Sequence, residues 1–128
     1  MSSALAAASA GAAGDARAEL ARVTETLQKL AATRQQLVVQ LNENEGVKAE
    51  LDALSADAEV FRSVGPALLK MDASDAKALV GGRITAIKAD VQRVEEQFEE
   101  AGKRRLEVVE RLSAGAPGSA RGAAGAQQ

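Results

Sequence analysis

Few side chains in this sequence could carry out catalytic chemistry. Histidine and cysteine are absent, which excludes a Ser-His-Asp triad, a histidine general base, and imidazole or thiolate metal ligands. The remaining candidates for acid–base work are two pairs of carboxylates, Glu95-Glu96 and Glu99-Glu100. Both pairs fall on the solvent-facing part of a predicted helix, where charge runs usually keep the surface solvated. The sequence therefore predicts no catalytic residue, no cofactor, no metal site and no enzyme activity.

Two short motifs might bind phosphate groups. Lys103-Arg104-Arg105 is basic, but acidic residues surround it and favour a solvated helix face. Gly81-Gly82 lacks the further glycines and the Lys-Ser/Thr pair of a phosphate-binding loop. The net charge of −2 gives no electrostatic reason to bind nucleic acid or an anionic membrane. No segment approaches the roughly 20 apolar residues that span a bilayer, so we expect neither nucleic acid nor a membrane as partner.

The composition indicates a mainly α fold built from long helices. Aromatic residues make up only 2% of the chain, and the large apolar residues are mainly Leu and Val, which suit narrow seams between helices. Both chain ends are rich in Ala, Ser and Gly, and we expect them to be disordered rather than to act as targeting signals. The predicted segments are a disordered extension at 1–14, a helix at 15–56, a hairpin at 59–72, a helix at 75–112 and a disordered tail at 113–128, with 15–112 as the one folded domain.

Each predicted helix carries a seam of residues spaced alternately by three and four, which is the heptad pattern of a coiled coil. Ser74 is a suitable N-cap for the second helix. Because the two patterns lie on either side of a short segment, we expect the helices to pair antiparallel. The first seam is Leu20, Val23, Leu27, Leu30, Arg34, Leu37, Leu41, Asn44, Lys48 and Leu51, and the second is Val80, Ile84, Ile87, Val91, Val94, Phe98, Ala101, Arg105, Val108 and Leu112.

The segment between the helices differs from an ordinary loop. Val60–Val64 and Ala67–Met71 are rich in apolar residues and flank Gly65-Pro66, which is typical of two strands joined by a turn. An apolar loop that covers the end of the helix pair is the alternative. An isolated hairpin is marginally stable, and both of its edges have unpaired backbone groups. We therefore expect the hairpin to pair with hairpins of other subunits in a closed sheet or β-barrel.

Four runs in this order resemble the β-type subunits of the prefoldin family, most of all the subunit-six branch of eukaryotes. The most specific part is a Glu-Asn-x-x-Val-Lys-x-Glu-Leu run followed by Val-Phe-x-x-x-Gly-Pro. The resemblance covers about Leu20 to Leu112, and the small residues Gly46 and Gly82 depart from it. The four runs are Gln40–Asn44, Val47–Leu51, Val60–Lys70 and Val80–Ile84.

The resemblance implies a cytoplasmic hexamer of α-type and β-type subunits that works without nucleotide. Its hairpins would form a double β-barrel, and its coiled-coil tips would hold unfolded clients, chiefly actin and tubulin, and deliver them to the cytosolic chaperonin. A self-contained coiled-coil tether or scaffold is the alternative function. The residues implied for subunit assembly are Val60, Phe61, Val64, Gly65, Pro66, Leu68, Leu69 and Met71. The residues implied for the client-binding tip are Leu20, Val23, Leu27, Leu30, Leu106, Val108, Val109 and Leu112. Fraying of the helix ends or a slight drift of the supercoil would explain the apolar surface at this end equally well.

Overall fold

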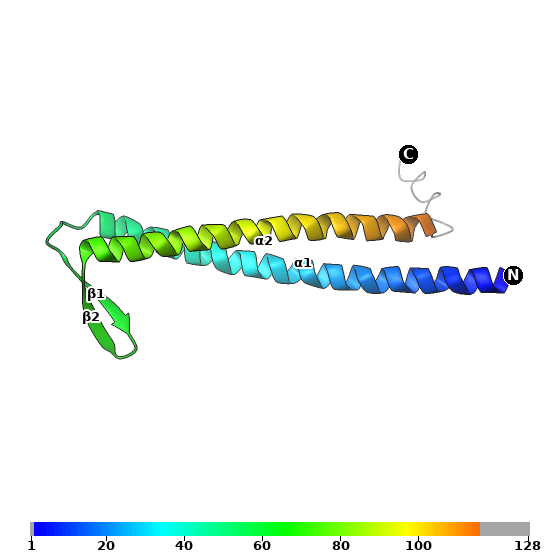
Figure 1. Cartoon of the computed structure of the whole chain (residues 1–128), viewed down its shortest axis with the longest axis horizontal. Helices are drawn as coiled ribbons and strands as arrows, with labels where there is room; N and C mark the ends of the chain where they lie inside the picture. Colours follow the sequence, from blue (N-terminus) through cyan, green and yellow to red (C-terminus); the bar gives the residue numbers. More distant parts are fainter. Residues whose placement is uncertain (1, 116–128) are drawn as a thin grey trace, which may run out of the picture. The chain divides into compact units, whose positions relative to one another are not determined.

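Two long helices and a two-stranded hairpin make up the computed structural model, which describes residues 2–115 (Figure 1). Helix α1 spans Ser2–Asp52, strands β1 and β2 span Glu59–Val64 and Ala67–Asp72, and helix α2 spans Ala73–Gly115. The predicted order of helix, antiparallel hairpin and helix is confirmed. Within residues 2–115, neither helix contains a stretch that is long and apolar enough to cross a bilayer.

The helix boundaries differ from the predicted ones. Residues 2–14, expected to be disordered, form the first part of α1. Alanine dominates this segment and has the highest intrinsic helix propensity, so it continues the helix that follows. At its other end α1 stops at Asp52 rather than at residue 56, and the amide of Leu54 donates to the carbonyl of Leu51 at 3.2 Å, which tightens the last turn.

Helix α2 begins earlier than predicted. It follows β2 directly at Ala73, so Ser74 lies inside the first turn instead of capping it. Residues 113–115, expected to belong to a disordered tail, complete the last turn of α2. The remainder of that predicted tail, 116–128, and Met1 lie outside the described residues.

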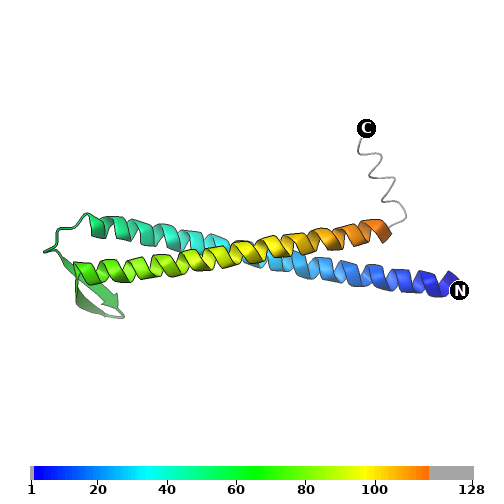
Figure 2. The same cartoon turned by 45° about the horizontal axis from the view of Figure 1, so that its top comes forward.

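The chain divides into two compact units, each of which contains part of both helices. Among the described residues, the first unit comprises 2–32 and 96–115, and the second comprises Thr33–Glu95, including the hairpin. In the first unit α1 and α2 run side by side (Figure 2). The buried residues there are Ala16, Val23 and Val108.

The second unit has a small core between its two helix segments. Leu51 of α1 packs with Ala76, Val80 and Ile84 of α2. Val80 and Ile84 belong to the predicted seam, whereas Ala76 lies four residues before Val80, one residue away from Lys77, where the alternating pattern would place the next seam position. A partly buried strand residue, Val60, packs against the same cluster and so attaches the hairpin to the helices.

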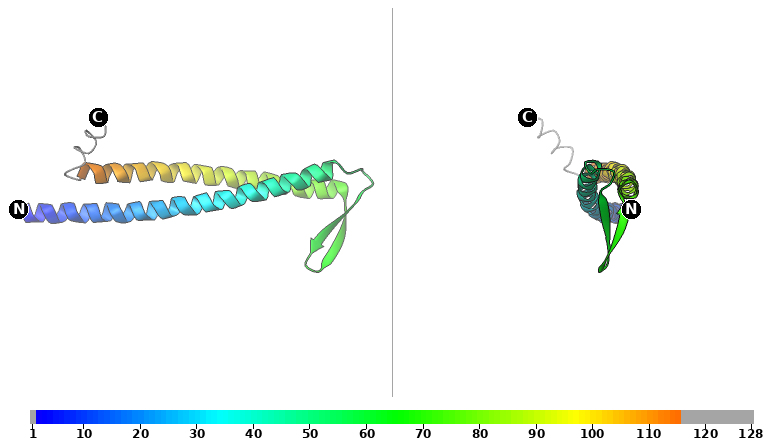
Figure 3. Two further views of the ribbon diagram at one scale, coloured as in Figure 1. Left: turned by 180° about the vertical axis from the view of Figure 1, so that it is seen from behind. Right: turned by 90° about the vertical axis from the view of Figure 1, so that its left-hand side faces the viewer.

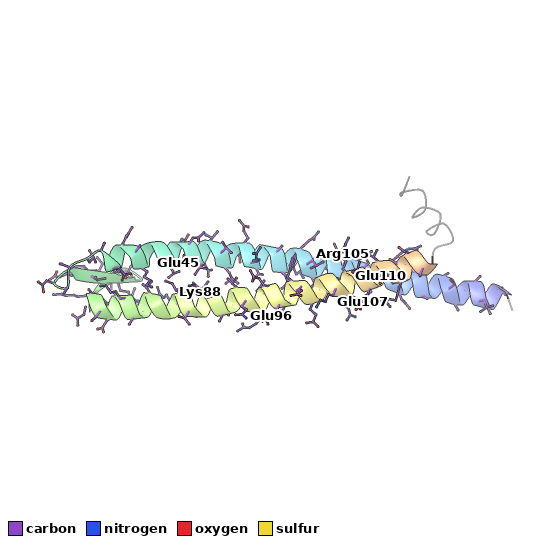
Figure 4. All side chains as sticks on the ribbon, turned by 90° about the horizontal axis from the view of Figure 1, so that it is seen from above. Glu45, Lys88, Glu96, Arg105, Glu107 and Glu110 are labelled. Atoms are coloured by element: carbon purple, nitrogen blue, oxygen red, sulfur yellow. The ribbon has the colours of Figure 1, made fainter. Side chains whose placement is uncertain are left out.

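Ion pairs across the helices accompany this seam. Lys88 Nζ lies 4.0 Å from Glu45 Oε1, and Figure 4 shows the two side chains on facing sides of α1 and α2. Arg34, a polar residue in the predicted seam, places its guanidinium 3.2 Å from Glu95. Arg34 therefore leaves the seam for an exposed ion pair at its edge. Together the two pairs support the predicted antiparallel register in this unit.

The hairpin extends away from the helices of the second unit (Figure 3). Its register pairs Val64 with Ala67, which leaves Gly65 and Pro66 as a two-residue turn. Gly65 has a φ of 57°, and the proline ring holds the next φ near about −65°. This combination of signs is typical of a type II′ turn, in which glycine takes the first central position.

Candidate functional site

The hairpin exposes large apolar side chains to solvent. Phe61 is 54% exposed and Leu68 is 70% exposed, and Val64 and Leu69 are also exposed. Of the predicted assembly residues, only Val60 and Met71 are partly buried within the chain. The hairpin is thus anchored at its base, while its apolar tip has no cover among residues 2–115.

The strand register distributes these residues over both faces of the ribbon. Successive side chains on a strand point to opposite faces, so Phe61 and Leu68 share one face with Ser63 and Lys70. Lys70 forms an ion pair of 3.0 Å with Glu59 on this face. The other face carries the remaining apolar residues: Val60, Val64, Ala67, Leu69 and Met71.

Both edges of the ribbon lack a neighbouring strand. The described residues form one sheet of two strands, so each strand has one row of backbone groups without a strand partner. Natural proteins seldom leave such an edge both apolar and uncovered, because it pairs readily with other strands. Two apolar faces and two open edges suit the hairpin to pairing with strands from other chains.

The predicted client-binding residues divide into three groups in the first unit. Val108 is 0% exposed and Val23 is buried, so both belong to the seam between the helices. Leu106 is 58% exposed and projects from α2 away from that seam. The others are partly buried: Leu20, Leu27, Leu30, Val109 and Leu112.

A cluster of three charges ties the helices together beside this seam. Arg111 donates to Oε2 of Glu19 at 2.7 Å, and Arg104 lies 2.9 Å from Oε1 of the same carboxylate. The Glu19 side chain is only 19% exposed. The hydrogen bond from Arg111 is the main cause that lowers the pKa of Glu19; partial burial opposes it, and the charges of both arginines reinforce it.

This cluster, which we call the Glu19 clamp, was not among the residues predicted from the sequence. The signal was present, however. Counted along the heptads, Glu19, Arg104 and Arg111 all take the g position, and g positions face each other across an antiparallel pair of helices. Extending the heptad count from the apolar seam to its flanks would have identified the clamp.

Four of the charged residues considered for catalysis or phosphate binding take part in surface ion pairs: Glu95, Glu99, Lys103 and Arg104. Glu95 pairs with Arg34, and Glu99 lies 3.5 Å from Lys103, four residues along α2. Arg104 belongs to the Glu19 clamp. Among residues 2–115, no three acidic side chains converge in a group that would hold a metal ion.

Comparison with known proteins gives consistent matches. The family model described as "Prefoldin subunit" matches residues 16–114. A protein of Bos taurus named "Prefoldin subunit 6" is 35% identical over 112 residues, covering 77% of this chain and 87% of that protein. A protein of Caenorhabditis briggsae named "Probable prefoldin subunit 6" is 32% identical over 80 residues, which span 62% of each chain.

A solved structure shares the fold. The crystal structure of the prefoldin beta subunit from Thermococcus strain KS-1 superposes with a TM-score of 0.75. The match covers 80% of this chain and 90% of that chain at 20% sequence identity. At this identity the likeness concerns the arrangement of helices and hairpin.

Proposed function

This chain belongs to the prefoldin subunit family, and we propose that it serves as a β-type subunit of a hetero-oligomeric co-chaperone in the cytoplasm. The observation that carries the proposal is the hairpin, whose apolar residues lie on both faces between two open edges. A ribbon of this kind gains stability only when other strands cover it. The hairpin is therefore the element that joins this subunit to its neighbours.

In the assembled complex, hairpins from several subunits pair edge to edge and close into a β-barrel. Phe61 and Leu68 on one face, and Val64 and Leu69 on the other, then lie on the two faces of the closed sheet, where neighbouring strands and side chains cover them. Gly65 and Pro66 set the turn that keeps these residues in register. Val60, which packs against the cluster of Leu51, Ala76, Val80 and Ile84, fixes the base of the hairpin on its own helices. The partners are other α-type and β-type prefoldin subunits.

The coiled-coil tips hold unfolded proteins of the actin and tubulin type and pass them to the cytosolic chaperonin. The client contacts belong to the first unit, from the set Leu20, Val23, Leu27, Leu30, Leu106, Val108, Val109 and Leu112. Each tip offers little apolar area, so affinity arises from several tips that bind one client at once. Weak individual contacts allow rapid release without nucleotide.

Mass measurement tests the assembly. We expect the purified chain to form a discrete hetero-oligomer, detected by light scattering, only when α-type and other β-type prefoldin subunits are added. The double substitution Val64→Asp with Leu68→Asp should prevent this, because it places a charge on each face of the hairpin, where assembly would bury it. The matched control is Val39→Asp, which alters an exposed valine of α1 outside the hairpin and should leave assembly intact.

The same mass measurement distinguishes the proposed co-chaperone subunit from a self-contained coiled coil. The heptad seams alone also fit a coiled-coil tether or scaffold, which has no use for an apolar hairpin. A stable homodimer that ignores added prefoldin subunits and tolerates both hairpin substitutions would favour the tether and overturn the proposed function.

A further inference from the structure

The two sides of the helix pair in the first unit differ sharply in charge. On one side lies the Glu19 clamp. Glu107 and Glu110 line a shallow hollow together with Glu19, Arg104 and Arg111, so this side carries five charged groups. Acidic and basic groups are mixed there, and an apolar segment laid across them would have to desolvate them.

The opposite side is nearly free of charge. Phe98 and Leu20 take the a position of the heptads, Gly102 and Val109 the e position, and Leu106 the neighbouring b position. These positions lie across the seam from the g positions of the clamp. Phe98 is 41% exposed and Leu106 is 58% exposed. We call this surface the apolar flank; it consists of Leu20, Leu27, Phe98, Gly102, Leu106 and Val109.

Two arginines without an ion-pair partner among residues 2–115 border the apolar flank. Arg105 follows Phe98 in the a position and is exposed, and Arg17 takes the e position on α1. Neither arginine forms an ion pair with residues 2–115, unlike Arg104 and Arg111 in the clamp. Two acidic residues also lie at this border: Glu99, which pairs with Lys103, and Glu110, which is four residues from Leu106 on α2 and also lines the hollow beside the clamp. Two cations are thus left to attract anionic groups.

The seam itself offers no comparable surface. Val108 is wholly buried and Val23 nearly so, and the Glu19 clamp bridges the two helices beside them. A bound segment that used these residues would first have to separate the helices. The apolar flank needs no such opening, since binding there only removes water from side chains that are already exposed.

We propose that the apolar flank docks an extended segment of an unfolded protein in which apolar side chains alternate with carboxylates. The apolar side chains cover Phe98, Leu106 and Val109, and the carboxylates approach Arg105 and Arg17. The Glu19 clamp keeps the helices closed during binding. This inference rests on the proposed co-chaperone function and names the face and the client chemistry within it.

Photo-crosslinking tests the face directly. The full chain, assembled with its partner subunits, carries p-benzoylphenylalanine in place of either Leu106 or Glu107. In the heptads Leu106 takes the b position beside the apolar flank, and Glu107 takes the c position beside the g positions of the clamp. The two probes therefore sample the two sides of one helix turn. The ligand is a labelled synthetic peptide in which leucines alternate with glutamates. We expect the crosslink yield at 106 to exceed that at 107 about five-fold or more, in proportion to contact.

Peptide competition tests the chemistry. A leucine–glutamate peptide should compete for the probe at 106 better than a leucine–lysine or a serine–glutamate peptide of equal length. Arg105→Glu should reverse the preference between glutamate and lysine, because it replaces a bordering cation by an anion. Val39→Ser, which alters an exposed valine of the second unit, is the matched control and should leave the preference unchanged.

The outcomes separate this inference from the proposed function. If the assembled complex suppresses aggregation of an unfolded protein but crosslinks equally at 106 and 107, or prefers the leucine–lysine peptide, the inference is overturned and the function stands. If the complex neither assembles nor suppresses aggregation, the proposed function fails, and the inference fails with it.

Discussion

Arg111 and Glu19 are 92 residues apart in the sequence and form a hydrogen-bonded ion pair of 2.7 Å between α2 and α1. Arg104 approaches the other oxygen of the same carboxylate. Because the two arginines are seven residues apart, they stand one heptad from each other along α2, and Glu19 bridges them. Both guanidinium groups are largely exposed, so solvent screens the attraction. The main effect of the clamp is to fix the register of the two helices in the first unit.

Replacing Glu19 by Gln should loosen the helix pair at this point. The side chain keeps its size but loses the charge that both arginines approach, so the seam beside it should open more often. We expect amide hydrogen exchange at Val108 to accelerate on the order of a few-fold, with no change at Ile84 in the second unit. Glu25→Gln is the matched control, because it breaks an exposed pair with Lys29 within α1. Equal exchange rates at Val108 in both variants would contradict the role assigned to the clamp.

The clamp also predicts a dependence of stability on acid. The pKa of Glu19 is lowered from its ordinary value of 4.5, chiefly by the hydrogen bond from Arg111. The folded chain therefore takes up this proton less readily than the unfolded chain does. The contribution of Glu19 is complete above the unfolded pKa and is lost as the pH falls through the lowered folded pKa.

The comparison of wild type with Glu19→Gln isolates this effect. Thermal unfolding followed by circular dichroism should show a constant difference in melting temperature above about pH 5.5. The difference should shrink as the pH falls below 4.5, the ordinary pKa of a glutamate. There the Glu19 carboxylate of the wild type becomes protonated, so that it is uncharged like the glutamine of the variant. A difference that grows toward acid would show that the sign of the pKa shift is wrong.

The small core of the second unit should be sensitive to truncation. Ile84 is buried against Leu51 and Val80, and Ile84→Ala removes apolar volume from a cluster with few members. We expect the free energy of unfolding, measured in urea, to fall by about 2–3 kcal/mol. Val39→Ala removes volume from an exposed position and should change it by no more than about 0.5 kcal/mol. Similar losses in the two variants would indicate that the cluster does not act as the core.

Much of this fold follows from the spacing of a few residue types. The periods of three and four placed Val23, Leu51, Val80, Ile84, Val94 and Val108 in the seams, and all of them are buried. Gly65 and Pro66 marked the turn of the hairpin, because few other residues accept its geometry. The resemblance to β-type prefoldin subunits, based on the order of four runs, is confirmed by the matching family model and relatives.

Other features depend on information that the apolar pattern does not carry. The helix at residues 2–14 was not predicted, because the low complexity of this segment indicated disorder. Its alanine content, which gives a high helix propensity, was the better guide. Phe98 occupies a seam position yet is partly exposed, which periodicity alone does not reveal. The Glu19 clamp was missed because the heptads were read only at their apolar positions. The flanking positions determine which side of a helix pair is charged and which is left open.

Two glycines with equally open surroundings should respond in opposite ways to a methyl group. Nothing lies within 4 Å of the position that a Cβ would take at Gly82 or at Gly65. Gly82 lies inside α2 with ordinary helical geometry, so Gly82→Ala should raise the free energy of unfolding by up to about 1 kcal/mol. Gly65 has a φ of 57°, and Gly65→Ala should destabilise the hairpin by about 1–2 kcal/mol. Urea denaturation measures the effect of Gly82→Ala on the whole chain. Hydrogen exchange at the Leu69 amide measures the effect of Gly65→Ala on the hairpin. Stabilisation by both substitutions would mean that the turn does not require a left-handed residue. Destabilisation by both would contradict the open surroundings of Gly82.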